Sequence, residues 1–150
     1  MKRTQDFKNS AGFTLVEMLV VIAIISLLAS FVLYSATQYI NKGRDATIKG
    51  NLAILITAGE LWYDKNDSSY TGFCVSGAVT KALSEIPTAD ADKHCYVNSS
   101  NTAWGTCAKE FVYNTKAYCV DNKGNQKEID IANCTNTITN CCFGAANCIP

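Results

Sequence analysis

The chain has 150 residues, a length that suggests one globular domain with an appendage. Its 13 Lys and Arg residues balance its 13 Asp and Glu residues, so the formal net charge is zero. A nucleic-acid-binding surface usually shows a basic excess, and we therefore infer no specific nucleic acid partner. The charge is unevenly distributed, because Lys2, Arg3 and Lys8 stand against Asp6 within the first twelve residues. The chain therefore starts basic, and its remainder is slightly acidic.

Residues 13–33 form one apolar run, FTLVEMLVVIAIISLLASFVL, in which Glu17 is the single charge. As a helix rising about 1.5 Å per residue, the run reaches roughly 30 Å, enough to cross a bilayer. The positive-inside rule keeps the basic start in the cytoplasm and places everything after about Tyr34 outside. A secretory signal is cut after its apolar core, whereas the small residue Gly12 precedes this run. Cleavage at Gly12 would remove a leader, residues 1–12, and keep the apolar segment.

Glu17 brings a carboxylate into the apolar segment, which costs about 2.5–3.5 kcal/mol on insertion scales. One interpretation is that it reaches the membrane interface from the helix start, where the helix dipole favours a negative charge. The other is that it neutralises the α-amino group of Phe13 that cleavage after Gly12 would create, in its own chain or in a neighbour.

The helix is predicted to continue beyond the apolar run to about residue 66, since no proline interrupts residues 34–66. Apolar residues there recur every three or four positions, the spacing of one helix face. The stripe consists of Ile48, Leu52, Leu55, Gly59 and Trp62, and Ala36, Ile40 and Gly43 prolong it backward. We expect the stripe to pack on a small domain, and the protruding apolar first half of the helix to need lipid or other subunits as a cover.

The remaining residues, 67–150, are expected to complete an α+β fold in which the long helix packs on a small antiparallel sheet. Turn-forming residues after Asn66 end the long helix, and Pro87 ends a short helix predicted over 79–86. Strands are predicted at 94–97, 110–113, 117–121 and 126–131, with a hairpin turn over 121–125. The large aromatic residues are expected in the core rather than in a ligand site: Trp62, Tyr63, Tyr70 and Trp104.

Eight cysteines lie after residue 73, a density typical of a disulfide-stapled domain that matures in an oxidising compartment. They form a first group, Cys74, Cys95, Cys107 and Cys119, and a second group, Cys134, Cys141, Cys142 and Cys148. No Cys/His spacing matches a zinc site. Eight cysteines allow about 105 connectivities, so the pairing stays open. We expect pairs within each group, and different partners for the adjacent Cys141 and Cys142.

No pattern for catalysis or cofactor binding stands out along the chain. The single histidine, His94, lies in no nucleophile motif, and no glycine-rich phosphate loop precedes a helix. Asp90 and Asp92 have a D-x-D spacing that can suit calcium, which makes them weak metal candidates, because two acids in a loop are usually just solvated. We therefore expect no enzyme, no catalytic residue and no cofactor.

The N-terminal residues closely resemble those of type IV pilins and the related pseudopilins. The match comprises the basic leader, Gly12, Phe13, the run Thr14-Leu15-Val16-Glu17 and the apolar helix, over about residues 1–40. The resemblance implies that a prepilin peptidase cuts between Gly12 and Phe13 and N-methylates Phe13. It also implies that Glu17 meets a neighbouring subunit's N-terminus, and that the helices bundle as the core of a homo-oligomeric helical filament. An assembly ATPase and a platform protein would act from the inner membrane.

The chain departs from many pilins in one respect, because it has no proline before Pro87. Melting of the helix on assembly is therefore less clearly encoded in this sequence.

The expected organisation is a leader at 1–12, a transmembrane and filament-core helix at 13–34, its amphipathic continuation at 35–66 and a globular head at 67–150. We expect a structural subunit, held by lipid as a single-pass protein of the inner membrane with its N-terminus inside, and then displayed in an extracellular pilus. Two alternatives stay open. One is a minor pilin or type II secretion pseudopilin, and the other is a membrane-anchored, Cys-rich adhesin that never polymerises.

Overall fold

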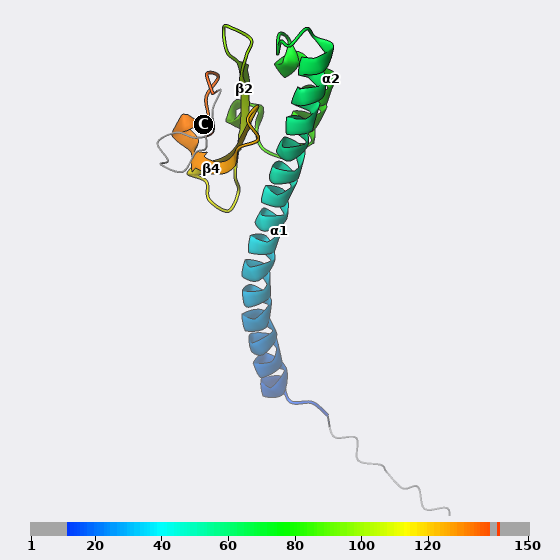
Figure 1. The fold of residues 1–150 in the computed structure, drawn as a ribbon. Helices are drawn as coiled ribbons and strands as arrows, with labels where there is room; N and C mark the ends of the chain where they lie inside the picture. Colours follow the sequence, from blue (N-terminus) through cyan, green and yellow to red (C-terminus); the bar gives the residue numbers. More distant parts are fainter. Residues whose placement is uncertain (1–11, 139–140, 142–150) are drawn as a thin grey trace, which may run out of the picture. The chain divides into compact units, whose positions relative to one another are not determined.

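The computed structural model describes residues 12–138 and Cys141 (Figure 1). Contacts divide the chain into two compact units, with the boundary between Thr37 and Gln38. The elements in chain order are helix α1 (Leu15–Lys65), the 3₁₀ turn η1 (Phe73–Val75), helix α2 (Gly77–Glu85), the 3₁₀ turn η2 (Asp90–Asp92), strands β1 (Lys93–Val97), β2 (Trp104–Lys109), β3 (Lys116–Asp121) and β4 (Gln126–Asp130), and the 3₁₀ turn η3 (Ile131–Asn133).

Helix α1 is a single helix of 51 residues, close to the predicted 13–66. Its hydroxyl side chains hydrogen-bond to its own carbonyl groups: Ser26 donates to Ile22, Ser30 to Ser26 and Thr37 to Leu33. Because these hydroxyl groups have hydrogen-bond partners within the helix, they avoid the free-energy cost of an unpaired polar group in an apolar surrounding.

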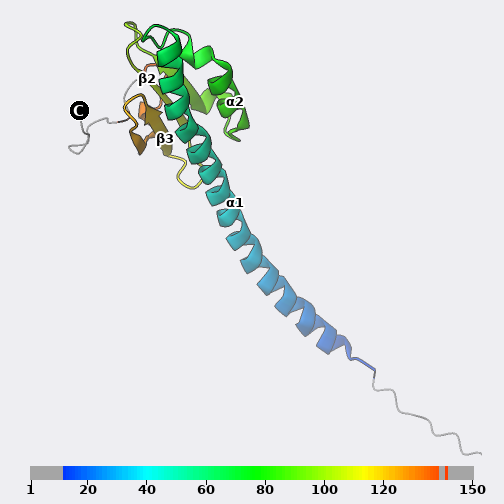
Figure 2. The ribbon, with the colours of Figure 1, turned by 45° about the vertical axis from the view of Figure 1, so that its right-hand side comes forward.

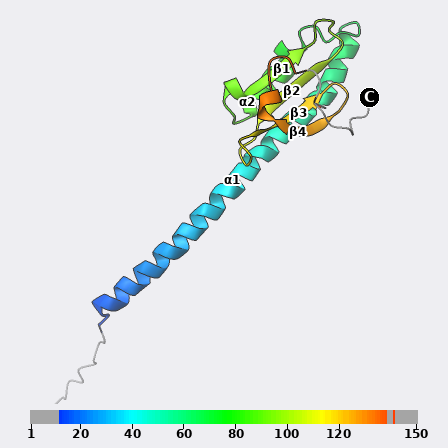
Figure 3. The same ribbon diagram turned by 90° about the vertical axis from the view of Figure 1, so that its left-hand side faces the viewer.

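The second unit contains a four-stranded antiparallel sheet in the order β1-β2-β3-β4. One sheet face and α1 enclose a core that includes Ile48, Leu52 and Leu55, three residues of the predicted helix stripe. Figures 2 and 3 show α1 running along this face. The opposite face carries a second core, which among the described residues comprises Cys107, Ala117, Cys119, Ile129, Cys134, Ile138 and Cys141. Successive strand residues point to opposite faces, so Cys119 and Val120 serve different cores.

The aromatic residues form the centre of the first core, as the sequence predicted. Trp104 and Phe73 are fully buried, and their ring centroids are 4.8 Å apart. Tyr70 and Trp62 also pack in this cluster. Gly59 of the stripe leaves room for the indole, because a Cβ atom there would lie 2.7 Å from Nε1 of Trp104.

Three of the predicted strands are found within a residue or two of their expected positions, and the predicted strand at 110–113 is wrong. The strand in that part of the chain is β2, which ends at Lys109. The carboxylate of Asp45, on α1, accepts hydrogen bonds from the backbone N–H groups of Phe111 (2.6 Å) and Val112 (3.0 Å). These donors are bound to the helix, so they cannot serve a sheet ladder.

The predicted hairpin turn and short helix are present. Gly124, between β3 and β4, has φ 78°, the left-handed conformation that glycine adopts without steric cost. Helix α2 begins at Gly77, two residues before the predicted start, because the Ser76 hydroxyl accepts a hydrogen bond from the Val79 N–H at its N-terminus.

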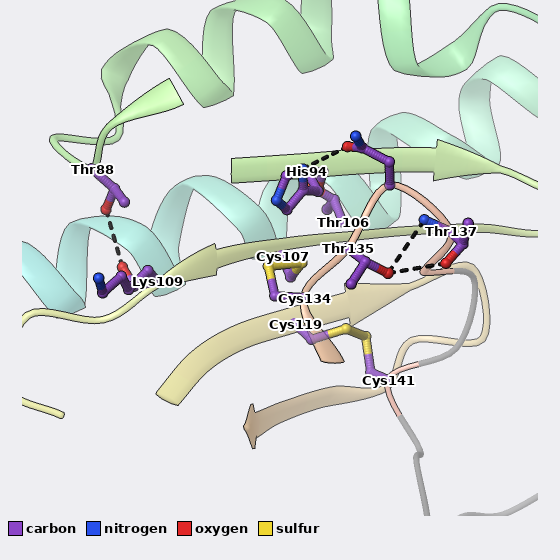
Figure 4. Close-up of a disulfide and its surroundings, with 11 residues drawn as sticks. Thr88, His94, Thr106, Cys107, Lys109, Cys119, Cys134, Thr135, Thr137 and Cys141 are labelled. Carbon is purple, nitrogen blue, oxygen red and sulfur yellow. Dashed lines mark hydrogen bonds between the residues drawn. A yellow bond between two sulfur atoms is a disulfide. The ribbon is translucent and has the colours of Figure 1, made fainter. Parts of the chain in front are cut away.

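Among the described residues, three disulfides join Cys74 to Cys95, Cys107 to Cys134 and Cys119 to Cys141. The prediction that cysteines pair within each group is confirmed for the bond of Cys74. It is wrong for the other two bonds, which join the first group to the second (Figure 4). Cys107 and Cys119 lie opposite each other on β2 and β3, on the face away from α1. The segment after β4 crosses this face, so each strand cysteine meets a cysteine of that segment. Cys142 and Cys148 lie outside the described residues.

Candidate functional site

The start of α1 is held by reciprocal hydrogen bonds between Thr14 and Glu17. The backbone N–H and the hydroxyl of Thr14 donate to Oε2 of Glu17 at 2.8 and 2.7 Å. The backbone N–H of Glu17 donates in return to the Thr14 hydroxyl oxygen at 3.2 Å. This arrangement is a capping box, which satisfies N–H groups that have no partner inside the helix. Its T-x-x-E signature is legible in the sequence, but neither of the two interpretations of Glu17 considered Thr14.

The capping box fixes one oxygen of the predicted assembly residue and leaves the other without a hydrogen bond. Within residues 12–138, Oε1 of Glu17 accepts none, while Oε2 takes both bonds from Thr14. The carboxylate is thereby held at the first turn of α1, close in sequence to Phe13 and Gly12. Both of these predicted processing residues are exposed and precede the helix. The Gly12–Phe13 peptide bond is thus accessible, and Glu17 follows four residues after Phe13 with one carboxylate oxygen held by Thr14.

The first unit exposes large apolar side chains around the whole circumference of α1. Every residue from 15 to 34 is exposed. Helix α1 is long and apolar enough to cross a membrane, judged by length and composition. A helix that is apolar all round is normally buried in a membrane or in a protein core. This surface is therefore the candidate interaction site of the chain.

In the second unit, a group of charged side chains ties α1 to the sheet. Nζ of Lys49 donates to Oε1 of Glu128 at 2.7 Å and lies 3.1 Å from Oε1 of Glu110. The Glu110 side chain is only 1% exposed, and neither of its oxygens has a hydrogen-bond partner among the described residues. Burial raises the pKa of Glu110, and Lys49 offsets this only in part. The hydrogen bond to Glu128 raises the pKa of Lys49.

Each of the two weak metal candidates is paired with a lysine. Asp90 lies 2.8 Å from Nζ of Lys93, and Asp92 lies 3.7 Å from Nζ of Lys109. No cluster of three or more His, Cys, Asp or Glu side chains suited to a metal ion occurs in the part of the chain that the structure describes. These aspartates therefore act as ion-pair partners in this structure.

His94 joins β1 to the segment after β4. Its Nδ1 lies 2.6 Å from Oδ1 of Asn136, beside the two disulfides of that face (Figure 4). The side chain is engaged in this contact and makes none with a nucleophile among the described residues.

Comparisons with known proteins agree with the resemblance. A family described as the prokaryotic N-terminal methylation motif matches residues 7–33. The type IV wide pilus major component PilA4 of Thermus thermophilus is 25% identical over 105 residues, which cover 65% of this chain and 80% of the relative. No solved structure matches.

Proposed function

We propose that this chain, a member of the type IV pilin superfamily, is a structural subunit that is processed, held in the inner membrane and then polymerised into an extracellular filament. The observation that carries the proposal is the part of α1 from 15 to 34, which is exposed and apolar on every side and lies almost wholly within the matched methylation motif at 7–33. A surface of this size needs lipid or protein to cover it.

Processing is the first proposed step. A prepilin peptidase cuts the exposed bond between Gly12 and Phe13 and methylates the new terminus, while the basic leader stays in the cytoplasm. Residues 13–34 then hold the chain in lipid as a single span. Residues 35–66 and the head at 67–150 lie outside, where an oxidising compartment permits the three disulfides.

Polymerisation is the second proposed step. Glu17 receives the positively charged N-terminus of a neighbouring subunit at the oxygen that Thr14 leaves open. A charge inside a bundle of apolar helices is costly unless it is paired, so this contact favours correctly staggered subunits. A cytoplasmic ATPase and a polytopic platform protein supply the force from the inner membrane.

The proposed subunit is an abundant one. The Thermus relative is called a major component, which favours a fibre-forming role over that of a minor pilin or a type II secretion pseudopilin. The superfamily is structural rather than enzymatic, and the charge pairs of the head serve its packing.

Substitution of Glu17 by Ala tests the proposal. Fibres sheared from cells and viewed by electron microscopy should be lost or strongly reduced, while the processed chain still accumulates in the membrane. Glu60→Ala removes an exposed glutamate of the same helix and is the matched control, expected to leave the fibres intact. Unchanged fibres in Glu17→Ala, or no fibres containing the unsubstituted chain, would instead favour the membrane-anchored adhesin.

A further inference from the structure

The second unit carries an apolar groove between α1 and α2. The two helices run side by side in Figure 2, and the groove between them has a volume of about 570 Å³. Its α1 side includes Ile54, Ala58 and Leu61, and its α2 side includes Ala78, Lys81 and Glu85. We call this surface the α1–α2 groove.

The groove follows from the side-chain sizes of the two helices. Ala58 and Ala78 are small, so the helices leave a hollow between them, while Ile54 and Leu61 are 59% and 55% exposed beside it. Positions 54, 58 and 61 are spaced by four and three residues and form one stripe along about two helical turns. The charges on the α2 side, Lys81 and Glu85, are exposed to solvent.

A stripe of this kind fits the apolar face of another helix, which presents side chains at the same spacing. The chain itself supplies such a face. Leu27, Phe31 and Tyr34 follow the same four-and-three spacing on α1 and are 74%, 73% and 68% exposed. No charged residue occurs from 18 to 41, so this face brings no charge against the apolar residues that line the groove. We call these three residues the apolar ridge.

The ridge and the groove are different surfaces, so a contact between them is heterologous. Each copy offers one ridge and one groove, so the contact can repeat from copy to copy, and it builds an open helical filament when the rotation between copies does not close into a ring. A groove-to-groove contact would instead form a closed dimer and leave the ridge uncovered. The pairing of ridge with groove therefore suits an open filament.

We propose that the α1–α2 groove receives the apolar ridge of a second copy of this chain. The inference rests on the proposed function, because the ridge becomes available only when the helix leaves lipid. It adds that the second unit, and not only the apolar residues 15–34, recognises a neighbouring subunit's helix.

Photo-cross-linking of the full-length chain in cells tests this contact. A benzophenone amino acid replaces Leu61 in the groove, and in a control it replaces Val75, an exposed residue that does not line the groove. Mass spectrometry of sheared fibres should find the Leu61 position joined to a peptide from residues 13–42 of another copy, and the Val75 position not joined to it. Cross-links from the groove only to another head, to a different protein or to lipid overturn the inference.

A charge in the groove gives a second test. Leu61→Lys should reduce the yield of sheared fibres about tenfold, because the lysine must lose its water against an apolar ridge. Val75→Lys should leave the yield unchanged. Leu61 is exposed, so the head should keep its protease resistance. If fibres form normally with Leu61→Lys, the contact between groove and ridge is refuted and the proposed function stands. If the unsubstituted chain forms no fibres, both fail.

Discussion

Replacing Lys49 by Met would remove the cation that ties α1 to the sheet. The substitution leaves the carboxylate of Glu110, 1% exposed and without a hydrogen-bond partner among the described residues, with no cation 3.1 Å away. Breaking a buried ion pair in this way typically costs about 3–5 kcal/mol. The contact with Glu128 contributes little, because both of its side chains are well exposed at 39% and 46%. We therefore expect Lys49→Met to lower the free energy of unfolding by roughly 3 kcal/mol at pH 7.

The stability lost in Lys49→Met should be smaller at acidic pH. Burial already raises the pKa of Glu110 above its ordinary value of 4.5, and removing Lys49 raises it further. A carboxyl with a raised pKa binds its proton more tightly in the folded state, so its contribution to stability is complete below the ordinary pKa and is lost as the pH rises through the folded pKa. Lys49 stays protonated throughout this range, since its own pKa is raised. Acidification from pH 7 toward 4.5 should therefore restore much of the stability.

Thermal unfolding of the full-length protein in detergent, followed by tryptophan fluorescence, measures both effects. A loss of roughly 3 kcal/mol corresponds to a fall in Tm of about 10–15 °C for a unit of this size. The double variant Lys49→Met, Glu110→Gln is the control, because it removes the unpaired charge and should recover most of the loss. A Lys49→Met protein that unfolds within about 2 °C of the unsubstituted chain, at pH 7 and at pH 5 alike, would refute the reasoning.

Three other changes probe the core, the helix start and the disulfides. Gly59→Ala places a methyl group 2.7 Å from the buried indole of Trp104 and should lower the free energy of unfolding by about 1–3 kcal/mol in the same assay. An unchanged Tm would show that the indole can move away. Thr14→Val removes both hydrogen bonds of the Thr14 hydroxyl and should lower the stability of the first turn of α1 by about 1 kcal/mol, seen as faster amide hydrogen exchange there, while Thr14→Ser should exchange like the unsubstituted chain. The double variant Cys107→Ser, Cys134→Ser should lose about 2–4 kcal/mol and become sensitive to proteases after β4, and equal resistance would contradict a staple at that site.

The sequence predicted α1 and the centre of its packing face well because both depend on local spacing, whereas the backward extension of the stripe, Ala36, Ile40 and Gly43, is exposed. Ile48, Leu52 and Leu55 repeat at intervals of three and four residues, and all three are fully buried. The strand at 110–113 was mistaken because its apolar and aromatic residues favour a strand, while the side chain that binds its N–H groups, Asp45, is remote in sequence. No local pattern reports such a contact.

The disulfides likewise depend on contacts between residues that are remote in sequence. The pairing of Cys107 and Cys119 depends on the register of β2 and β3 and on where the following segment crosses the sheet. Neither is encoded by cysteine spacing. The capping box differs, because its residues, Thr14 and Glu17, are three positions apart and form a recognisable signature. The residues of the candidate site, Thr14 and Glu17, could therefore be identified from the sequence. Which oxygen of Glu17 binds Thr14 could be obtained only from the structure.

We propose above all that the chain is processed at Gly12 and built into a fibre through the helix that follows. Intact-mass spectrometry of fibres sheared from cells tests it most directly. The account predicts a polypeptide that begins at Phe13, carries one added methyl group and retains three or more disulfides. A fibre-associated chain that still carries residues 1–12, or fibres that lack the chain altogether, would contradict it.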